Sequence, residues 1–413
     1  MIVTHCDLLI VGAGPAGLAA ARAASGRGLK LVLLDDNPLP GGQIWRARAG
    51  QVAAEVGSLP GDVTLLTQTR VAAVLGSHRL LLEDARGGRT LDFDTLILCT
   101  GARELLLPFP GWTLPGVTGA GGLQALIKGG VEVADECLVV AGTGPLLLAS
   151  AATARQAGAR IALVAEQAER RAVLEFGLQL WRWPNKLRQA LTLATPRYSP
   201  GTWVEAALGT ERLEAVRLCQ GERRWEIACD RLACGYGLVP NVELAQSLGC
   251  ATLEGAVAVD DHQRTSQPHI LAAGECTGIG GNELAQATGR IAGLVASSQL
   301  DAVASVQAQA QARAWRRFAA QLARTFALNP AIARLAQPDT LVCRCEDVAL
   351  GALVGHADWT QAKLRSRCGM GACQGRICGQ ATRVLLDWTP PVPRFPLQPT
   401  RIDSLLALTE DER

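Results

Sequence analysis

CDLLIVGAGPAG, residues 6–17, is the stretch that decides the fold of this chain. Its residues 8–11, LLIV, form an apolar run typical of a buried strand, and the glycines after them predict a tight turn into an alanine-rich helix. The run LKLVLLDD at 29–36 predicts a second strand that ends in acidic residues. Strand, glycine turn, helix and strand in this order indicate a βαβ unit.

Each glycine of GAGPAG has its own role in a dinucleotide-binding unit. Gly12 permits the tight turn, Gly14 lets the backbone approach a pyrophosphate, and Gly17 allows the helix to pack closely on the strand. Pro15 and Ala16 begin the helix, whose positive N-terminus faces the phosphates. We therefore predict a dinucleotide site here. A tight turn without a ligand is the alternative.

Asp35 strengthens this prediction, because it lies 23 residues after Gly12, where an acid binds the adenosine ribose. The segment GGQIWR at 41–46 follows the second strand directly. Its glycines allow the backbone to lie against a cofactor, which makes Gly42 and Gln43 candidate binding residues.

A later segment, TSQPHILAAGECTG at 265–278, favours FAD over NAD. Its strand ends in Gly274 and Glu275, and this carboxylate can meet the hydroxyls of a flavin's ribityl chain. The helix expected from about residue 281 directs its positive end at the isoalloxazine.

These segments resemble the flavoprotein disulfide reductase superfamily, in which an FAD domain is split around an inserted NAD-like domain. TLILCTGA at 95–102 is similar to the superfamily's crossover, with Thr100 and Gly101 as binding residues, and the resemblance spans 7–300. No CxxC or CxxxxC pair follows GGQIWR. Cys229 and Cys234 lie in IACDRLAC, which is typical of a strand and its exit. A dithiol reductase is thus not expected.

A second unit with the same pattern, ECLVVAGTGPLLLASAATARQAGARIALVAE, covers residues 136–166. Gly142 and Gly144 match the first two glycines, but Leu147 stands at the third position, so the packing of helix on strand must loosen. Glu166, 24 residues after Gly142, favours NAD over NADP because an acid repels a 2′-phosphate. A working NAD(P) site and a structural domain without one both remain open.

Five of the thirteen cysteines lie between residues 343 and 378, in LVCRCEDV and CGMGACQGRIC. Thiolates suit soft metals, so zinc, a two-iron cluster and unliganded thiols are the alternatives. Interspersed glycines favour iron, because open backbone can donate amide hydrogen bonds to sulfur. The other eight cysteines lie singly in apolar contexts, which indicates buried thiols.

Composition excludes several classes of function. Lys and Arg total 40 against 38 Asp and Glu, which gives no electrostatic basis for binding nucleic acid. No apolar run is long enough for a transmembrane segment, and no leader pattern is visible. We expect a cytoplasmic protein and leave peripheral membrane association open.

CRCEDV with GMGACQGRIC resembles the bacterioferritin-associated ferredoxin type of [2Fe–2S] domain, in the variant attached to amine-oxidising flavoproteins. That resemblance implies Cys343, Cys345, Cys373 and Cys378 as ligands, and we expect Cys368 to be a packing residue. With LPGVTGAGGLQALIK at 114–128 included, nearly the whole chain resembles the FAD-bearing alpha subunits of opine oxidases, hydroxyproline dehydrogenases and hydrogen cyanide synthase.

That family resemblance implies a hetero-oligomer in which a flavin-containing, amine- or amino-acid-oxidase-like beta subunit oxidises the substrate at its C–N bond. It also allows a small gamma subunit and an FMN at a subunit interface. No catalytic residue is evident in this chain, so we expect an electron-transfer subunit with FAD and a [2Fe–2S] cluster. The alternatives are a self-sufficient NAD(P)H-dependent reductase and a non-enzymatic scaffold or redox sensor.

The predicted fold is thus α/β, with two dinucleotide-binding domains and a small C-terminal iron–sulfur domain. The expected order is FAD domain, first part (1–108), NAD(P)-like domain (109–236), FAD domain, second part (237–300), helical connector (301–340), cluster domain (341–390) and proline-rich strap (391–413).

Overall fold

The computed structural model describes residues 3–47, 51–298 and 303–410. The chain divides into two compact units. The first comprises Met1–Arg103, Val239–Ala320 and Val392–Arg413, and the second comprises Glu104–Leu238 and Gln321–Pro391. The first unit is therefore split around an insertion. Residues 1–2, 48–50, 299–302 and 411–413, which fall within the predicted domain ranges, lie outside the described residues.

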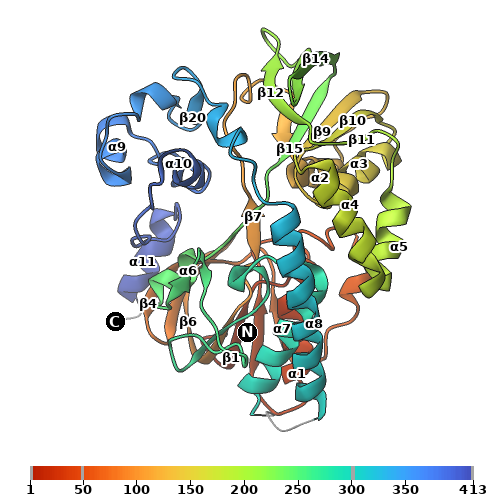
Figure 1. The fold of residues 1–413 in the computed structure, drawn as a ribbon. Coiled ribbons are helices and arrows are strands. Elements are labelled where there is room, and N and C mark those ends of the chain that lie inside the picture. Colours follow the sequence, from red (N-terminus) through yellow and green to blue (C-terminus); the bar gives the residue numbers. More distant parts are fainter. Residues whose placement is uncertain (1–2, 48–50, 299–302, 411–413) are drawn as a thin grey trace. The chain divides into compact units, whose positions relative to one another are not determined.

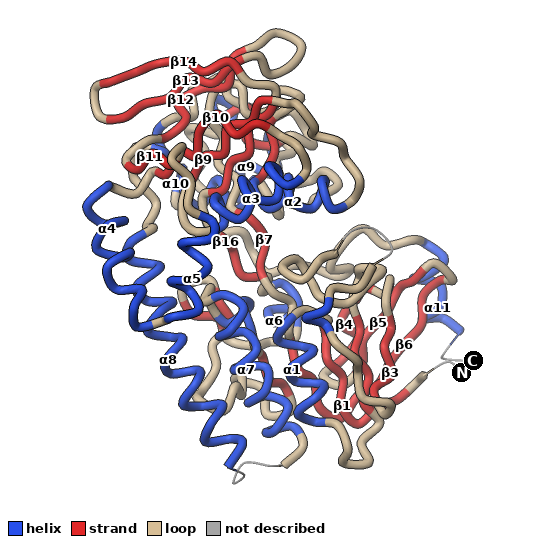
Figure 2. Tube along the Cα trace, turned by 90° about the vertical axis from the view of Figure 1, so that its right-hand side faces the viewer, coloured by secondary structure: helices blue, strands red, loops and turns tan. Residues whose placement is uncertain are grey.

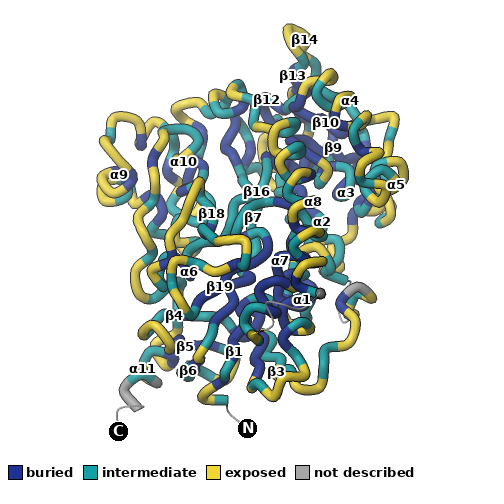
Figure 3. The backbone as a smooth tube through the Cα atoms, turned by 60° about the horizontal axis from the view of Figure 1, so that its bottom comes forward, coloured by how far each residue is buried: buried dark blue, intermediate teal, exposed yellow. Residues whose placement is uncertain are grey.

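A mixed sheet forms the centre of the first unit (Figure 1). Its core strands are continuous Leu, Ile and Val runs, as expected for parallel strands buried on both faces. The short strand β19 (Ile270–Ala272) pairs in parallel with the end of β6, and Figure 3 shows β19 buried. The spatial order of the remaining strands is β3 (Val63–Leu66), β2 (Leu31–Leu34), β1 (His5–Val11), β6 (Gly87–Leu98), β5 (Arg79–Asp84) and β4 (Arg70–Gly76).

Two helices cross closely in the first unit, as Figure 2 shows for α1 and α7. A Cβ at Gly289 or Gly293 of α7 would overlap the carbonyl oxygen of Ala16 or Ala20 of α1, so only glycine permits this approach. The helices of the first unit are α1 (Pro15–Ala24), α6 (Glu243–Ser247), α7 (Gly281–Ala296), α8 (Val303–Thr325), whose last turn belongs to the second unit, and α11 (Ile402–Glu410).

The C-terminal tail differs from the expected strap in one respect. The prolines do give an extended segment, in which the Leu397 amide donates to the Ala72 carbonyl at 2.9 Å. After Pro399, however, the chain forms helix α11, and Leu405 and Leu408 pack against Ala73. The prolines directly before this short helix obscured the helical spacing of its apolar residues in the sequence.

The second unit has a parallel five-stranded sheet in the order β11 (Tyr198–Pro200), β10 (Arg160–Glu166), β9 (Cys137–Gly142), β15 (Arg231–Gly235) and β8 (Val117–Gly119). An antiparallel sheet of β12 (Trp203–Leu208), β13 (Ala215–Gln220) and β14 (Arg223–Ala228) follows. Its nucleotide-fold helices are α2 (Ala120–Lys128), α3 (Leu146–Gln156), α4 (Arg170–Gln179) and α5 (Pro184–Leu193). The chain passes between the units at β7 (Ala102–Glu104) and β16 (Leu238–Pro240).

The cysteine-rich segment belongs to the second unit and has its own small core around Trp359 and Trp388. Its elements are the antiparallel pair β20 (Leu341–Cys343) and β21 (Val348–Ala349) and the helices α9 (Trp359–Ser366) and α10 (Cys378–Leu386). Throughout the described residues, no helix combines the length and the apolar character needed to cross a membrane.

Candidate cofactor sites

The glycine turn of the first unit leads from β1 into α1. A Cβ on Gly12, whose φ is +106°, would overlap the carbonyl oxygen of Cys99 on the crossover from β6. A Cβ on Gly17 would likewise overlap the carbonyl oxygen of Gly12. The helix begins at Pro15, so the turn presents the free amides of the first helical turn, as an anion site requires.

Asp35 follows β2 and reaches back to the glycine turn. One carboxylate oxygen accepts a hydrogen bond from the Ala13 amide at 2.6 Å, and the other accepts one from the Asn37 amide at 2.8 Å. The residue is buried, at 6% exposure. These bonds fix the acid at the carboxyl edge of the sheet, beside the turn.

The GGQIWR segment folds against the same turn. The Gly41 amide donates to the Ala13 carbonyl at 2.8 Å. Gly42 lies so near that its Cβ would be 3.0 Å from the Cα of Gly14, whereas Gln43 is exposed. The two glycine segments, distant in sequence, therefore adjoin.

The crossover after β6 is fixed by a residue that the sequence analysis did not identify. Thr100 Oγ1 donates to the Asn241 carbonyl at 2.7 Å, and Asn241 Nδ2 donates to the Thr100 carbonyl at 2.8 Å. The Asn241 amide also donates to the Gly101 carbonyl at 2.9 Å. The Pro-Asn dipeptide at 240–241 is the one local signal that marks this position.

The fourth predicted segment also reaches the start of α1. A Cβ on Gly274 would lie 2.7 Å from the Ala16 Cβ, and the Gly274 amide donates to Thr288 Oγ1 at 3.0 Å. Burial raises the pKa of Glu275. A hydrogen bond from the Gly281 amide lowers this pKa by a smaller amount, so the net change is upward. The predicted FAD segments thus converge on the glycine turn, on the first turn of α1 or on the crossover beside them.

The second unit repeats the glycine turn with differences. Leu147 replaces the third glycine and is fully buried in the core with Ala120 and Leu123. Glu166 is fully buried, and its two oxygens accept hydrogen bonds from the amides of Gly144 (2.7 Å) and Ala168 (2.9 Å). Burial raises the pKa of Glu166 although these bonds lower it. Both carboxylate oxygens are therefore engaged within the fold.

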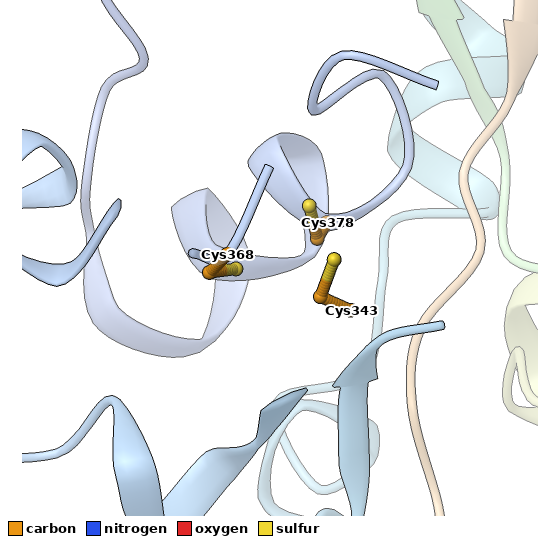
Figure 4. Close-up of side chains that lie close together, drawn as sticks. All are labelled: Cys343, Cys368 and Cys378. Carbon is orange, nitrogen blue, oxygen red and sulfur yellow. The ribbon is translucent and has the colours of Figure 1, made fainter. Parts of the chain in front are cut away.

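Three cysteines of the C-terminal segment form a buried group. The sulfur atoms of Cys343, Cys368 and Cys378 all lie within 4.8 Å of one another (Figure 4). Cys343 ends β20, Cys378 begins α10, and Cys368 follows α9. Three separate elements thus supply soft donors to one place.

Cys345 and Cys373 extend this group toward the surface. The Cys373 thiol hydrogen-bonds with Cys378 and with Cys345, which is exposed, and the bond from Cys378 lowers the pKa of Cys373 to about 4. Hydrogen bonding to Cys368 and Cys373 raises the pKa of Cys378. Of the four predicted ligands, Cys343 and Cys378 thus belong to the close group, whereas Cys345 and Cys373 lie beside it.

Cys368 is expected to be a packing residue, but its sulfur lies beside those of two predicted ligands, Cys343 and Cys378. Local spacing does not reveal this, since the turn at Arg367 (φ +66°) directs the chain after α9 back into the group.

The glycines of the cysteine-rich segment have steric roles. A Cβ on Gly371 would overlap the Cβ of Cys345, and one on Gly369 would lie 2.5 Å from the Trp359 ring.

The chemistry of this donor set fits a soft metal centre. Three buried thiols, with two more beside them, can supply the four thiolates that either zinc or a [2Fe–2S] cluster takes. By contrast, Cys229 and Cys234 are buried, and burial raises the pKa of each to about 12, so neither forms a reactive thiolate readily.

Glu104 is a further residue that the sequence analysis missed. Its carboxylate accepts hydrogen bonds from the Gly121 amide at 2.7 Å and the Gly122 amide at 2.9 Å at the start of α2. A Cβ on Gly119 would overlap this carboxylate. The glycines of VTGAGG therefore form a cradle for a half-buried acid, and their clustering is the signal that could have indicated it.

Comparison with known proteins agrees with this geometry. The family model of pyridine nucleotide-disulphide oxidoreductases matches residues 6–292, and the chain belongs to this family of flavoproteins. Within it, the chain is 33% identical to the HcnB subunit of hydrogen cyanide synthase from Pseudomonas aeruginosa, over 95% of this chain and 96% of that protein. It is 32% identical to an opine oxidase subunit from Agrobacterium tumefaciens, over 90% of this chain and 84% of that one.

Among solved structures, L-proline dehydrogenase from P. horikoshii has the same fold, with a TM-score of 0.69 at 19% identity over 98% of this chain and 80% of that chain. The predicted α/β fold of the flavoprotein disulfide reductase type and the predicted resemblance to subunits of hydrogen cyanide synthase and opine oxidase are confirmed, whereas the [2Fe–2S] cluster stays a prediction. The chain is a flavin-dependent oxidoreductase of the group that includes HcnB and this opine oxidase subunit, and the family supports FAD as its cofactor.

Proposed function

We propose that this chain is the electron-transfer subunit of a heteromeric amine or imino-acid dehydrogenase or oxidase. It holds FAD in the first unit and a [2Fe–2S] cluster on Cys343, Cys345, Cys373 and Cys378. The observation that carries the proposal is the buried group of Cys343, Cys368 and Cys378, with Cys373 and Cys345 next to it, in a chain with an FAD-type fold. When bound, an iron–sulfur centre passes single electrons, whereas a flavin exchanges them in pairs.

The relatives' names support a partner. HcnB and the opine oxidase relative are each named as one subunit of an enzyme. We infer that the substrate is oxidised in a flavin-containing companion, and that electrons reach the FAD of this chain through the cluster. A small gamma subunit and an interface FMN are compatible with this arrangement.

Three histidines of the first unit support this division of labour. His78 and His269 stack on each other with ring centroids 4.0 Å apart, and His5 pairs with Asp94. These imidazoles are engaged in the fold. We therefore infer that the general base for amine oxidation lies in the companion subunit and not among these histidines.

The test uses the native complex and the isolated chain side by side. The tagged native protein is purified anaerobically, its companions are identified, and candidate opines, hydroxyproline and glycine are added to each preparation. We expect flavin reduction in the complex and none in the lone chain. Amine oxidation by the lone chain would overturn the proposed division of labour.

A second candidate is an NAD(P)H-dependent reductase that passes electrons outward through the cluster. The observation that favours it is the second βαβ unit, which keeps Gly142 and Gly144 and has Glu166 at its acid position. Rapid bleaching of flavin absorbance on mixing the isolated chain with NADH would support this candidate over the relay subunit.

A further inference from the structure

The part of the connector that follows α8 lies over the glycine turn of the second βαβ unit. We infer that its residues 326–329 occupy the place where the pyrophosphate of a dinucleotide would sit. The second βαβ unit would then hold the connector in place as a clamp and exclude NAD(P). All the residues that carry this inference belong to the second unit.

Phe326 covers the turn itself. In a dinucleotide site the second glycine leaves its bare side open so that the pyrophosphate can approach the backbone. Here that side of Gly144 faces Phe326, whose ring carbon Cγ lies 3.9 Å from where a Cβ on the glycine would be. Thr143 Oγ1, in the same turn, donates to the Phe326 carbonyl at 3.2 Å.

Gln167 holds the rest of the segment. It directly follows Glu166 and is 2% exposed. Its Nε2 donates to the Ala327 carbonyl at 2.7 Å, and its Oε1 accepts a hydrogen bond from the Asn329 amide at 2.6 Å. A residue at the edge of the expected ribose site thus engages both ends of its amide with the connector.

An aromatic contact with Phe176 covers the side of Phe326 that faces away from the glycine turn. The Phe176 ring of α4 meets the Phe326 ring edge-on, with centroids 5.2 Å apart and planes at 75°. Phe176 is buried. Phe326 is therefore packed between the glycine turn and a helix, and a dinucleotide would have to displace it and break the hydrogen bonds to Thr143 and Gln167.

The clamp also gives the second βαβ unit a structural role that needs no NAD(P). Twelve residues beyond Asn329 the chain enters β20, where the Leu341 carbonyl accepts a hydrogen bond from Trp112 Nε1 at 2.7 Å. Cys343 ends that strand. The nucleotide fold therefore anchors the entry to the cysteine-rich segment at two places, and the inference does not depend on which metal those cysteines hold.

The first test is direct binding to the full-length, FAD-loaded chain. Isothermal titration with NADH and with NADPH is expected to show no saturable binding up to about 1 mM, the upper end of ordinary substrate affinities. Saturable binding of either nucleotide in the micromolar range would overturn the inference. Because iron and flavin content are measured separately, this failure is distinguishable from failure of the proposed function.

The second test examines the clamp itself. We expect Gln167→Ala to increase hydrogen–deuterium exchange in residues 326–335 at least tenfold, because it removes both side-chain hydrogen bonds to the segment. Gln189→Ala is the matched control, since Gln189 is an exposed glutamine on α5 of the same unit. Equal exchange of the segment in Gln167→Ala, Gln189→Ala and the unaltered chain would contradict the clamp.

Discussion

The sulfur atoms of Cys343 and Cys378 lie within 4.8 Å of each other, although the two residues are 35 positions apart in the chain. β20 brings one thiol and the first residue of α10 brings the other. Replacing Cys378 by serine should therefore remove a central thiolate. We expect Cys378→Ser to purify with background iron, as measured by metal and sulfide analysis.

The control for that variant is Cys250→Ser, which alters a buried free cysteine of the first unit. Its iron content should equal that of the unaltered chain. Full retention of iron and sulfide by Cys378→Ser would refute the predicted role of this residue.

Cys368 and Cys373 allow the ligand set to be decided. If the four ligands are those that the family resemblance implies, Cys373→Ser loses iron whereas Cys368→Ala keeps it. This comparison is informative because the buried Cys368 thiol lies beside Cys343, and both Cys368 and Cys373 are near enough to bind the proposed metal centre. Loss of iron in Cys368→Ala alone would transfer the ligand role to Cys368.

Gly17→Ala should impair the first cofactor site. The added methyl group would overlap the Gly12 carbonyl oxygen, so α1 must shift away from β1, at a cost of about 1–3 kcal/mol in unfolding free energy. We expect a lower denaturation midpoint and reduced FAD content. Gly61→Ala serves as the control because no atom lies within 4 Å of its Cβ position. Equal FAD content in both variants would contradict the close approach.

Glu104 should make stability depend on pH. Burial raises its pKa despite hydrogen bonds from the Gly121 and Gly122 amides, so the folded chain binds this proton more tightly than the unfolded chain. The stabilisation is complete below the ordinary glutamate pKa of about 4.3 and is lost as pH rises through the folded value. Denaturant midpoints at several pH values should show a weaker dependence in Glu104→Gln, whereas the exposed control Glu132→Gln should match the unaltered chain.

Local sequence predicted those parts of the sites that lie within one βαβ unit. The spacing from Gly12 to Asp35 is set by one helix and one strand, so the acid could be placed from the sequence alone. The observed bond from the Ala13 amide to Asp35 agrees with that placement.

The sequence could not predict contacts between distant segments. Asn241 meets Thr100 across 141 residues, and Gln167 meets Ala327 across 160. Neither residue belongs to a motif, because each side chain binds backbone groups of its partner, which any residue can supply. Only the fold brings these partners together.

The central claim is that one chain carries both an organic and an inorganic redox group. Its most direct test is the analysis of full-length protein purified anaerobically, combining the visible spectrum with iron, zinc and acid-labile sulfide content. The account predicts a flavin spectrum with about two iron atoms and about two sulfides per chain. Colourless protein, or zinc in place of iron, would contradict it.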